Sequence, residues 1–238
     1  MRLFFLLSLL VATLLSWSCT ESSPEPTPAG PPPTNPPAPS GAVSFLALGD
    51  SYTIGQSVPA ADRWVVQLAG MAQAEGLQPP DIIARTGWTT GELQQAIAVA
   101  NNQQTYGLVS LMIGVNNQYR GLPLAAYRTE FRGLLQTAIR FAGNRPGRVL
   151  VLSIPDWGQS PQGQRADPPR IGQEIDQFNA AAQQECAAAG VAFVGITDLT
   201  RAAAGDATQF APDGLHYSGA QMRQWAQRAL PVVQGLLR

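Results

Sequence analysis

A serine, an aspartate and the single histidine of this 238-residue chain have the types and spacing that nucleophilic catalysis requires. Ser51 lies in a turn, residues 49–52, that follows an apolar stretch. Asp213 precedes His216 by three residues, so its carboxylate can reach Nδ1 of the imidazole and leave Nε2 free. A hydroxyl nucleophile, an imidazole base and a carboxylate that orients the base form the triad of many hydrolases.

Two more residues have the chemistry to stabilise a developing oxyanion. Gly87 follows a second apolar stretch, and glycine lets a backbone N–H approach a ligand closely. Asn116 follows a third, and its amide can donate a hydrogen bond toward the same point. Taken singly, these residues also fit structural roles, since polar residues and glycine are common in turns and helix caps. Taken together, they indicate a hydrolase site, although the Gly-x-Ser-x-Gly elbow of lipases is absent.

Five apolar stretches recur along the chain, with amphipathic helical patterns between them. Strands that alternate with helices predict an α/β fold, in which a five-stranded parallel sheet has helices on both faces. Functional sites of such sheets form at the carboxyl ends of the strands, which is where the candidate residues lie. The expected strands cover residues 43–48, 81–85, 107–113, 148–154 and 191–196.

The helical patterns carry recognisable start and stop signals. Thr89 and Glu92 have the spacing of a capping box, and Gly190 follows the apolar face that begins at Ile175. Cys186 falls on that same face, so we expect a buried and inert thiol. In the turn after the first strand, we expect Ser51 to face solvent.

Composition excludes several classes of protein. The chain is 45% apolar and 13% charged, which argues against disorder, and its two cysteines cannot form a disulfide scaffold. All 15 basic residues are arginine, so a Walker A loop, a Schiff-base lysine and a Ser-Lys dyad are excluded. A single histidine excludes most histidine-based metal sites. No basic run or patch appears, so nucleic acid is not an expected partner.

The N-terminal segment has the pattern of an export signal. Arg2 precedes an apolar run over residues 3–17, which predicts a signal peptide over residues 1–18. Cys19 resembles the lipidated cysteine of a bacterial lipobox, with Ser16 in place of the usual aliphatic residue; the alternative is ordinary cleavage nearby that leaves Cys19 free. Residues 19–41 then form a Pro-rich linker, which can span roughly 60 Å at about 3.1 Å per residue.

These features predict three parts: the signal peptide, the anchor with its linker, and a folded domain over residues 42–238. The protein is then expected to be exported and held at a bacterial membrane by its N-terminal lipid, on the periplasmic or the cell-surface side. Nothing in the sequence indicates the oligomeric state.

Over residues 43–238 the chain resembles the SGNH hydrolases, also called GDSL-type esterases and lipases. Four blocks carry the resemblance: G-D-S at 49–51, Gly87, G-x-N at 114–116, and D-x-x-H at 213–216. The stretches 113–121, 153–161 and 174–179 are similar to a bacterial subgroup described as lysophospholipase-like or general esterases. The resemblance implies a three-layer αβα sandwich of flavodoxin-like topology, with neither cofactor nor metal.

The resemblance also implies a role for each site residue. Ser51 is the nucleophile, His216 the base and Asp213 the residue that orients it. The oxyanion hole comprises the backbone N–H groups of Ser51 and Gly87 and the side chain of Asn116.

The chain departs from the family at two positions, where Trp88 and Asn117 replace aspartates often found there. Trp88 is either an apolar wall beside the nucleophile or a packing residue. Trp157, in a loop expected over residues 156–170, is a second candidate for the pocket wall, unless that loop is only surface variation.

The function implied is hydrolysis of a small-molecule carboxylic ester, a lysophospholipid or a short acyl ester, through an acyl-enzyme. The alternative within the family is a carbohydrate O-acetyl esterase; a thioester is a further substrate class. A protein that binds surface glycans without turnover is a third interpretation. A nucleotide-binding flavodoxin-like domain is weaker still, because no Gly-rich phosphate loop follows the first strand.

Overall fold

The sheet of the protein has five parallel strands in the order β2-β1-β3-β4-β5. The structure, a computed structural model, describes residues 41–238; the expected signal peptide, Cys19 and residues 19–40 of the linker lie outside the described residues. This strand order is that of flavodoxin-like folds. The strands are β1 (Phe45–Gly49), β2 (Asp81–Ala84), β3 (Leu108–Met112), β4 (Val149–Leu152) and β5 (Ala192–Val194).

The burial of each strand follows its place in the sheet. Every residue of the three inner strands, β1, β3 and β4, is buried. The outer strands β2 and β5 are partly exposed. Strands with helices on both faces are expected to be continuously apolar, and this is why the sequence shows them as uninterrupted apolar stretches. All five predicted strands are confirmed, with no end shifted by more than two residues.

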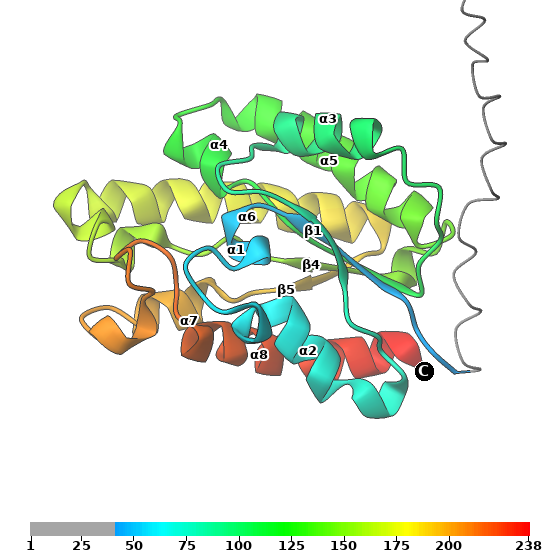
Figure 1. The fold of residues 1–238 in the computed structure, drawn as a ribbon. Coiled ribbons are helices and arrows are strands. Elements are labelled where there is room, and N and C mark those ends of the chain that lie inside the picture. Colours follow the sequence, from blue (N-terminus) through cyan, green and yellow to red (C-terminus); the bar gives the residue numbers. More distant parts are fainter. Residues whose placement is uncertain (1–40) are drawn as a thin grey trace, which may run out of the picture. The chain divides into compact units, whose positions relative to one another are not determined.

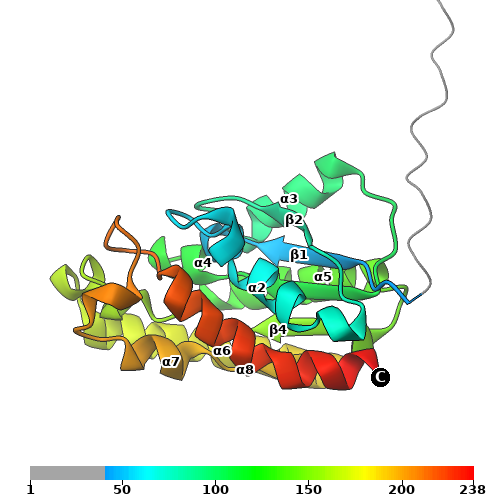
Figure 2. The same ribbon diagram turned by 60° about the horizontal axis from the view of Figure 1, so that its bottom comes forward.

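Helices cover both faces of the sheet and complete three layers (Figure 1). One face carries α3 (Thr90–Ala100), α5 (Leu124–Phe141) and α6 (Pro168–Ala189), and the other carries α2 (Trp64–Met71) and α8 (Gly219–Leu237). Figure 2 shows α8 lying along α2, with α7 (Thr197–Ala202) beside it. The predicted αβα sandwich is therefore confirmed. Two short helices, α1 (Ser51–Ile54) and α4 (Val115–Tyr119), follow β1 and β3 directly.

Local signals explain where the helices begin and end. Thr89 accepts from the N–H of Glu92 at 3.3 Å, and Glu92 accepts from the N–H of Thr89 at 2.8 Å, so the predicted capping box starts α3. The helix α6 begins at Pro168, seven residues before the predicted Ile175, because Asp167 caps it and proline is compatible with a first turn. The expected loop 156–170 therefore ends earlier than predicted. Gly190, at φ 68°, ends α6 as expected.

The core beneath α6 confirms the interpretation of the cysteine. Cys186 is buried and unbonded, and burial raises the pKa of its thiol to about 12. Its neighbour Glu185 accepts hydrogen bonds from Arg128 and Arg132 on α5, at 2.5 and 2.6 Å. This ion-pair cluster joins α5 to α6.

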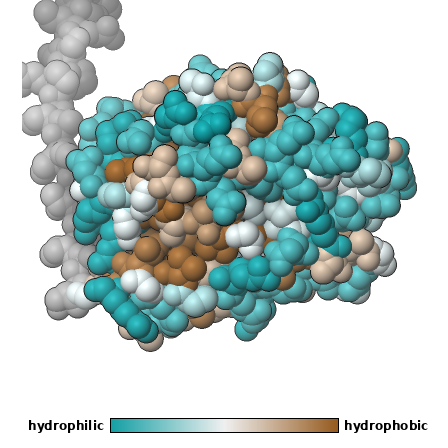
Figure 3. Space-filling view, turned by 180° about the vertical axis from the view of Figure 1, so that it is seen from behind, coloured by the Kyte–Doolittle hydropathy of each residue, from teal (hydrophilic) through white to brown (hydrophobic). Residues whose placement is uncertain are grey.

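Seen from behind, the surface is largely hydrophilic, and apolar residues gather mainly in the lower left of this view (Figure 3). Among the described residues, no helix has both the length and the apolar character needed to cross a bilayer.

Candidate active site

The candidate residues meet at the carboxyl edge of β1 and β3, where the strand order reverses. β1 pairs with β2 on one side and with β3 on the other, so the chain leaves β1 and β3 in opposite directions. A crevice is expected at such a point. Ser51 begins α1 directly after β1, and Asn116 lies in α4 directly after β3.

The turn that holds Ser51 is tightly packed. Asp50 caps α1 by accepting from the N–H of Tyr52 at 3.0 Å. At Gly49, a Cβ atom would lie 2.1 Å from Thr53 Oγ1 and 2.6 Å from the carbonyl oxygen of Met112, so only glycine allows this approach. Ser51 itself is 4% exposed, which corrects the expectation of a solvent-facing turn.

The carboxylate and the imidazole are paired as the spacing predicts. Asp213 Oδ2 lies 2.8 Å from His216 Nδ1, which leaves Nε2 unpaired with the acid. The imidazole ring lies 5.2 Å, centroid to centroid, from the ring of Tyr52, the residue after Ser51. Among the described residues, the Ser51 hydroxyl makes no hydrogen bond to His216. Such bonds are often long without substrate and tighten in the complex.

Four hydrogen bonds saturate the carboxylate of Asp213. Oδ1 accepts from the backbone N–H groups of Leu215 and His216, each at 2.9 Å, and Oδ2 accepts from Ser57 Oγ at 2.6 Å as well as from the imidazole. Burial raises the pKa of Asp213, but the hydrogen bonds from Ser57, His216 and Leu215 outweigh burial and lower it to about 2. The group is therefore a carboxylate at neutral pH.

The predicted oxyanion donors are available. Neither the N–H of Ser51 nor that of Gly87 has a hydrogen-bond acceptor among residues 41–238. Gly87 has φ +84°, a backbone conformation that glycine adopts readily and that residues with a Cβ atom disfavour. Asn116 Nδ2 donates one hydrogen to the carbonyl oxygen of Trp88 at 2.9 Å, which leaves the second amide hydrogen for a ligand. The same bond fixes the orientation of the amide relative to the Gly87 turn.

The two departures from the family pattern have structural explanations. Asn117 is buried, accepts from the N–H of Thr90 at 3.0 Å and donates to Thr90 Oγ1 at 2.7 Å. The single proton of the Thr90 hydroxyl is already donated to Glu130, so Thr90 Oγ1 needs a donor at position 117, which an amide supplies and a carboxylate does not. Trp88 is half-buried and packs against the core, so its packing role is observed.

Trp157, a predicted candidate for the pocket wall, is mostly buried, and the exposed aromatic ring beside it is that of Tyr119. Trp157 is 9% exposed, and its Nε1 donates to Gln118 Oε1 at 2.6 Å. The ring of Tyr119 packs edge-on against it at 5.0 Å and is itself 60% exposed. Tyr119 lies three residues after Asn116 in α4, on the same helical side. The sequence analysis did not single out Tyr119, although this spacing is a signal for it.

The loops around the candidate site form a ring in which each contacts the next. Thr86 donates to Gln56 at 2.6 Å, Gln162 donates to the carbonyl oxygen of Asp213 at 2.9 Å, and Ser57 donates to the Asp213 carboxylate. The guanidinium of Arg120 donates to the carbonyl oxygen of Gly87, and the Tyr119–Trp157 contact joins α4 to the loop after β4. The sequence analysis missed Ser57 and Arg120, because contacts between distant loops have no local pattern.

Asp50 is a second acidic group that the sequence analysis did not assign. Its side chain is fully buried, and burial raises its pKa to about 7 against the opposing hydrogen bond from the N–H of Tyr52. Oδ2 has no partner among the described residues. Within the same residues, no three His, Cys, Asp or Glu side chains are grouped so that they can hold a metal ion.

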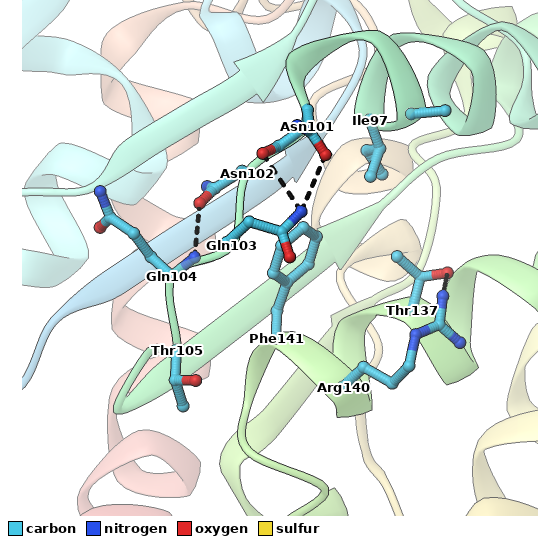
Figure 4. Close-up of a pocket in the computed structure, with 10 residues that line it drawn as sticks. Ile97, Asn101, Asn102, Gln103, Gln104, Thr105, Thr137, Arg140 and Phe141 are labelled. Carbon is cyan, nitrogen blue, oxygen red and sulfur yellow. Dashed lines mark hydrogen bonds between the residues drawn. The ribbon is translucent and has the colours of Figure 1, made fainter.

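A pocket of about 360 Å³ lies at the opposite, amino edge of the sheet (Figure 4). Its wall comes from the end of α3, the stretch before β3 and the end of α5. Gln103 donates to Asn101 Oδ1 at 2.8 Å, and Arg140 donates to Thr137 at 2.7 Å, so its polar groups largely satisfy one another. None of the predicted site residues lines it. The lining residues are Ile97, Ala98, Asn101, Asn102, Gln103, Gln104, Thr105, Thr137, Arg140 and Phe141.

Several solved structures share this fold. TesA superposes with a TM-score of 0.63 at 18% identity, covering 81% of this chain and 99% of its own. The psychrotrophic esterase EstA from Pseudoalteromonas sp. gives 0.61 at 16% identity, covering 81% and 97%. Axe2, an acetylxylan esterase from Geobacillus stearothermophilus, gives 0.62 at 19% identity, covering 81% and 95%.

A comparison with curated proteins finds no match. The sequence profile of the GDSL-like lipase/acylhydrolase family matches residues 47–224, a span that runs from β1 to α8 and includes Ser51, Gly87, Asn116, Asp213 and His216. The chain therefore belongs to the GDSL-like lipase/acylhydrolase family and is a hydrolase of ester bonds.

Proposed function

We propose that the protein is a serine esterase that cleaves carboxylic esters through an acyl-enzyme formed on Ser51. The observation that carries this proposal is the pairing of Asp213 with His216 Nδ1 at 2.8 Å, on a ring that packs against the residue following Ser51. This arrangement leaves Nε2 free to act as the base for Ser51.

In the proposed first step, Ser51 Oγ attacks the carbonyl carbon of the ester and His216 Nε2 takes the hydroxyl proton. The imidazolium then gives that proton to the alkoxide that leaves, and the acyl group remains on Ser51. In the second step His216 takes a proton from water, the hydroxide attacks the acyl-enzyme, and the proton returns to Ser51 as the acid is released.

The oxyanion formed in each step is stabilised by three donors. The unpaired N–H groups of Ser51 and Gly87 are free to donate, and Asn116 supplies the second hydrogen of its amide. Asp213 keeps its negative charge at neutral pH and so stabilises the imidazolium that forms in each step.

For the substrate, a lysophospholipid or another short acyl ester is the first candidate, on the sequence similarity to general esterases. A carbohydrate O-acetyl ester is the second, and the rim of the site favours it. Tyr119 presents an exposed ring on the side of α4 that carries Asn116, and rings of this kind stack on sugars. Arg120, Gln56 and Thr86 place hydrogen-bonding groups around the same rim.

A substrate panel tests both levels of this proposal. The purified domain should hydrolyse p-nitrophenyl acetate, and Ser51→Ala should abolish that turnover without changing the thermal midpoint of unfolding by more than a few degrees. Preference within a series from acetate to palmitate, beside acetylated xylan and lysophosphatidylcholine, then identifies the substrate class. Full activity in Ser51→Ala contradicts the assigned nucleophile.

We also propose that the protein is exported and anchored by a lipid on Cys19, with the Pro-rich segment as spacer. The support is the N-terminal sequence alone: the basic start, the apolar run and the cysteine that follows. Cys19→Ser should move the protein from the membrane fraction to the soluble fraction and leave its specific activity unchanged. Membrane retention of that variant would mean that another feature anchors the protein.

A further inference from the structure

The turn after α1 contacts both ends of the candidate triad. Ser57 Oγ donates to Asp213 Oδ2 at 2.6 Å, and the same oxygen accepts from His216 Nδ1 at 2.8 Å. In the same turn, the N–H of Gln56 donates to the carbonyl oxygen of Ser51 at 2.9 Å. One short turn therefore connects the candidate nucleophile with the acid, although the acid lies 156 residues from Ser57 in the chain.

The backbone of Ser57 is in an unfavourable conformation. Its φ is +64°, and the other non-glycine residues with positive φ between residues 41 and 238 are both asparagines, Asn101 and Asn144. Asparagine tolerates this region through its short polar side chain, and serine does so less well. Glycine would therefore suit the backbone better, but glycine has no hydroxyl to give to Asp213. A strained backbone whose side chain contacts a candidate catalytic acid is typical of functional sites.

We propose that Ser57 is a positioning residue, which orients the Asp213 carboxylate toward His216 and, by sharing Oδ2, weakens the pull of that carboxylate on the imidazole. This inference rests on the proposed function, in which His216 is the base. Without the hydroxyl, the carboxylate attracts the imidazolium more strongly, so the imidazole stays protonated to a higher pH. The carboxylate also becomes freer to turn, which lowers the rate at every pH.

The other ionisable groups near the imidazole are unchanged by a substitution at Ser57. Tyr52 on α1 contacts the ring, and Asp50, Asp156 and Tyr217 surround Tyr52 in turn. None of them hydrogen-bonds to Ser57 among the described residues.

The test uses two variants with opposite effects on the backbone. Ser57→Gly removes the hydroxyl and relieves the positive φ, whereas Ser57→Ala removes the hydroxyl and keeps the strain. Because His216 is the only histidine, its imidazole C–H resonances can be followed by NMR in untagged protein as the pH is changed. Both variants should shift the imidazole titration upward by about half a pH unit and lower kcat by about fivefold. Of the two variants, Ser57→Gly should have the higher thermal midpoint, because only glycine relieves the positive φ.

Asn144→Gly is the matched control, because it relieves a positive φ of +59° in the turn after α5 and leaves the site untouched. It should change neither the titration nor kcat. If both Ser57 variants titrate as the wild type does, or if their activity falls only in proportion to lost stability, the positioning role is wrong. The NMR titration does not require turnover, so it decides this role even if no ester is hydrolysed, which would instead contradict the proposed function.

Discussion

The two edges of the sheet hold different kinds of site. At the carboxyl edge, residues from five separate loops converge, and bonds such as Ser57 to Asp213 join segments far apart in the chain. At the amino edge, a pocket of about 360 Å³ is lined by neighbouring amides that bond one another. The amino-edge pocket has volume but no nucleophile or base. The candidate active site of this fold is therefore identified by the functional groups that converge there, and a pocket alone does not identify it.

The edges also differ in what the fold tolerates. The carboxyl edge holds the buried carboxyl of Asp50 and the positive φ of Ser57. At the amino edge, the non-glycine residues with positive φ are Asn101 and Asn144, and asparagine tolerates this conformation. Features that oppose stability thus concentrate where the candidate chemistry is, as is common at active sites. Substitutions at the carboxyl edge should therefore change activity, or the pH dependence of stability, whereas substitutions at the amino edge should leave activity nearly unchanged.

The largest difference between the edges should come from Asp213→Asn. The asparagine can hold the imidazole in place but favours the wrong tautomer, so kcat should fall by about 10⁴-fold. Stopped assays with p-nitrophenyl acetate measure this loss, and circular dichroism checks that the fold persists. A loss below about tenfold would mean that another acid orients His216.

A smaller loss is expected for Asn116→Ala, which removes one oxyanion donor. We expect kcat to fall by about 10²–10³-fold while KM changes little, because the bond strengthens in the transition state. Steady-state kinetics separate the two constants. If KM rose and kcat held, Asn116 would bind the substrate and would not stabilise the oxyanion.

Asp50→Asn tests whether the buried carboxyl at the carboxyl edge makes the free energy of unfolding depend on pH. Burial raises the pKa of Asp50 to about 7, so its neutral form is favoured in the folded state. The preference for the neutral carboxyl adds to the free energy of unfolding. This contribution is complete below about pH 4 and is lost as the pH rises through 7, a change of up to about 4 kcal/mol. Asparagine still accepts from the N–H of Tyr52 but does not ionise. Urea unfolding at pH 5 and pH 8 should therefore show a smaller pH-dependent loss in the variant, and parallel losses would contradict the assignment.

The smallest effect is expected at the amino edge. The double variant Gln103→Ala, Arg140→Ala removes two exposed polar side chains of the pocket, each of which bonds only to its neighbours. Turnover of p-nitrophenyl acetate should stay within about twofold of the wild type, since surface substitutions away from a site rarely matter. A loss comparable to that of Asn116→Ala would show that the amino-edge pocket takes part in function.

The sequence predicted the scaffold better than the rim of the site. Continuous apolar strands and the Thr89 capping box are local signals, and the structure confirms both. The Asp213–His216 pair was predictable because the two residues lie three apart. The contact of Ser57 with Asp213 joins segments 156 residues apart, and no periodicity encodes it. Burial of Ser51 was also missed, since the loops that cover it come from other parts of the chain.

Labelling with a fluorophosphonate tests the central claim most directly, because such a probe reacts with a serine only where a base activates it. The chain has no lysine, so trypsin leaves Ser51 and Ser57 in one peptide that ends at Arg63, and fragmentation must locate the adduct among the serines of that peptide. The account predicts a single adduct, on Ser51, that is lost in Ser51→Ala and at a pH low enough to protonate His216. An adduct on another serine, or ester hydrolysis without any adduct on Ser51, would contradict it.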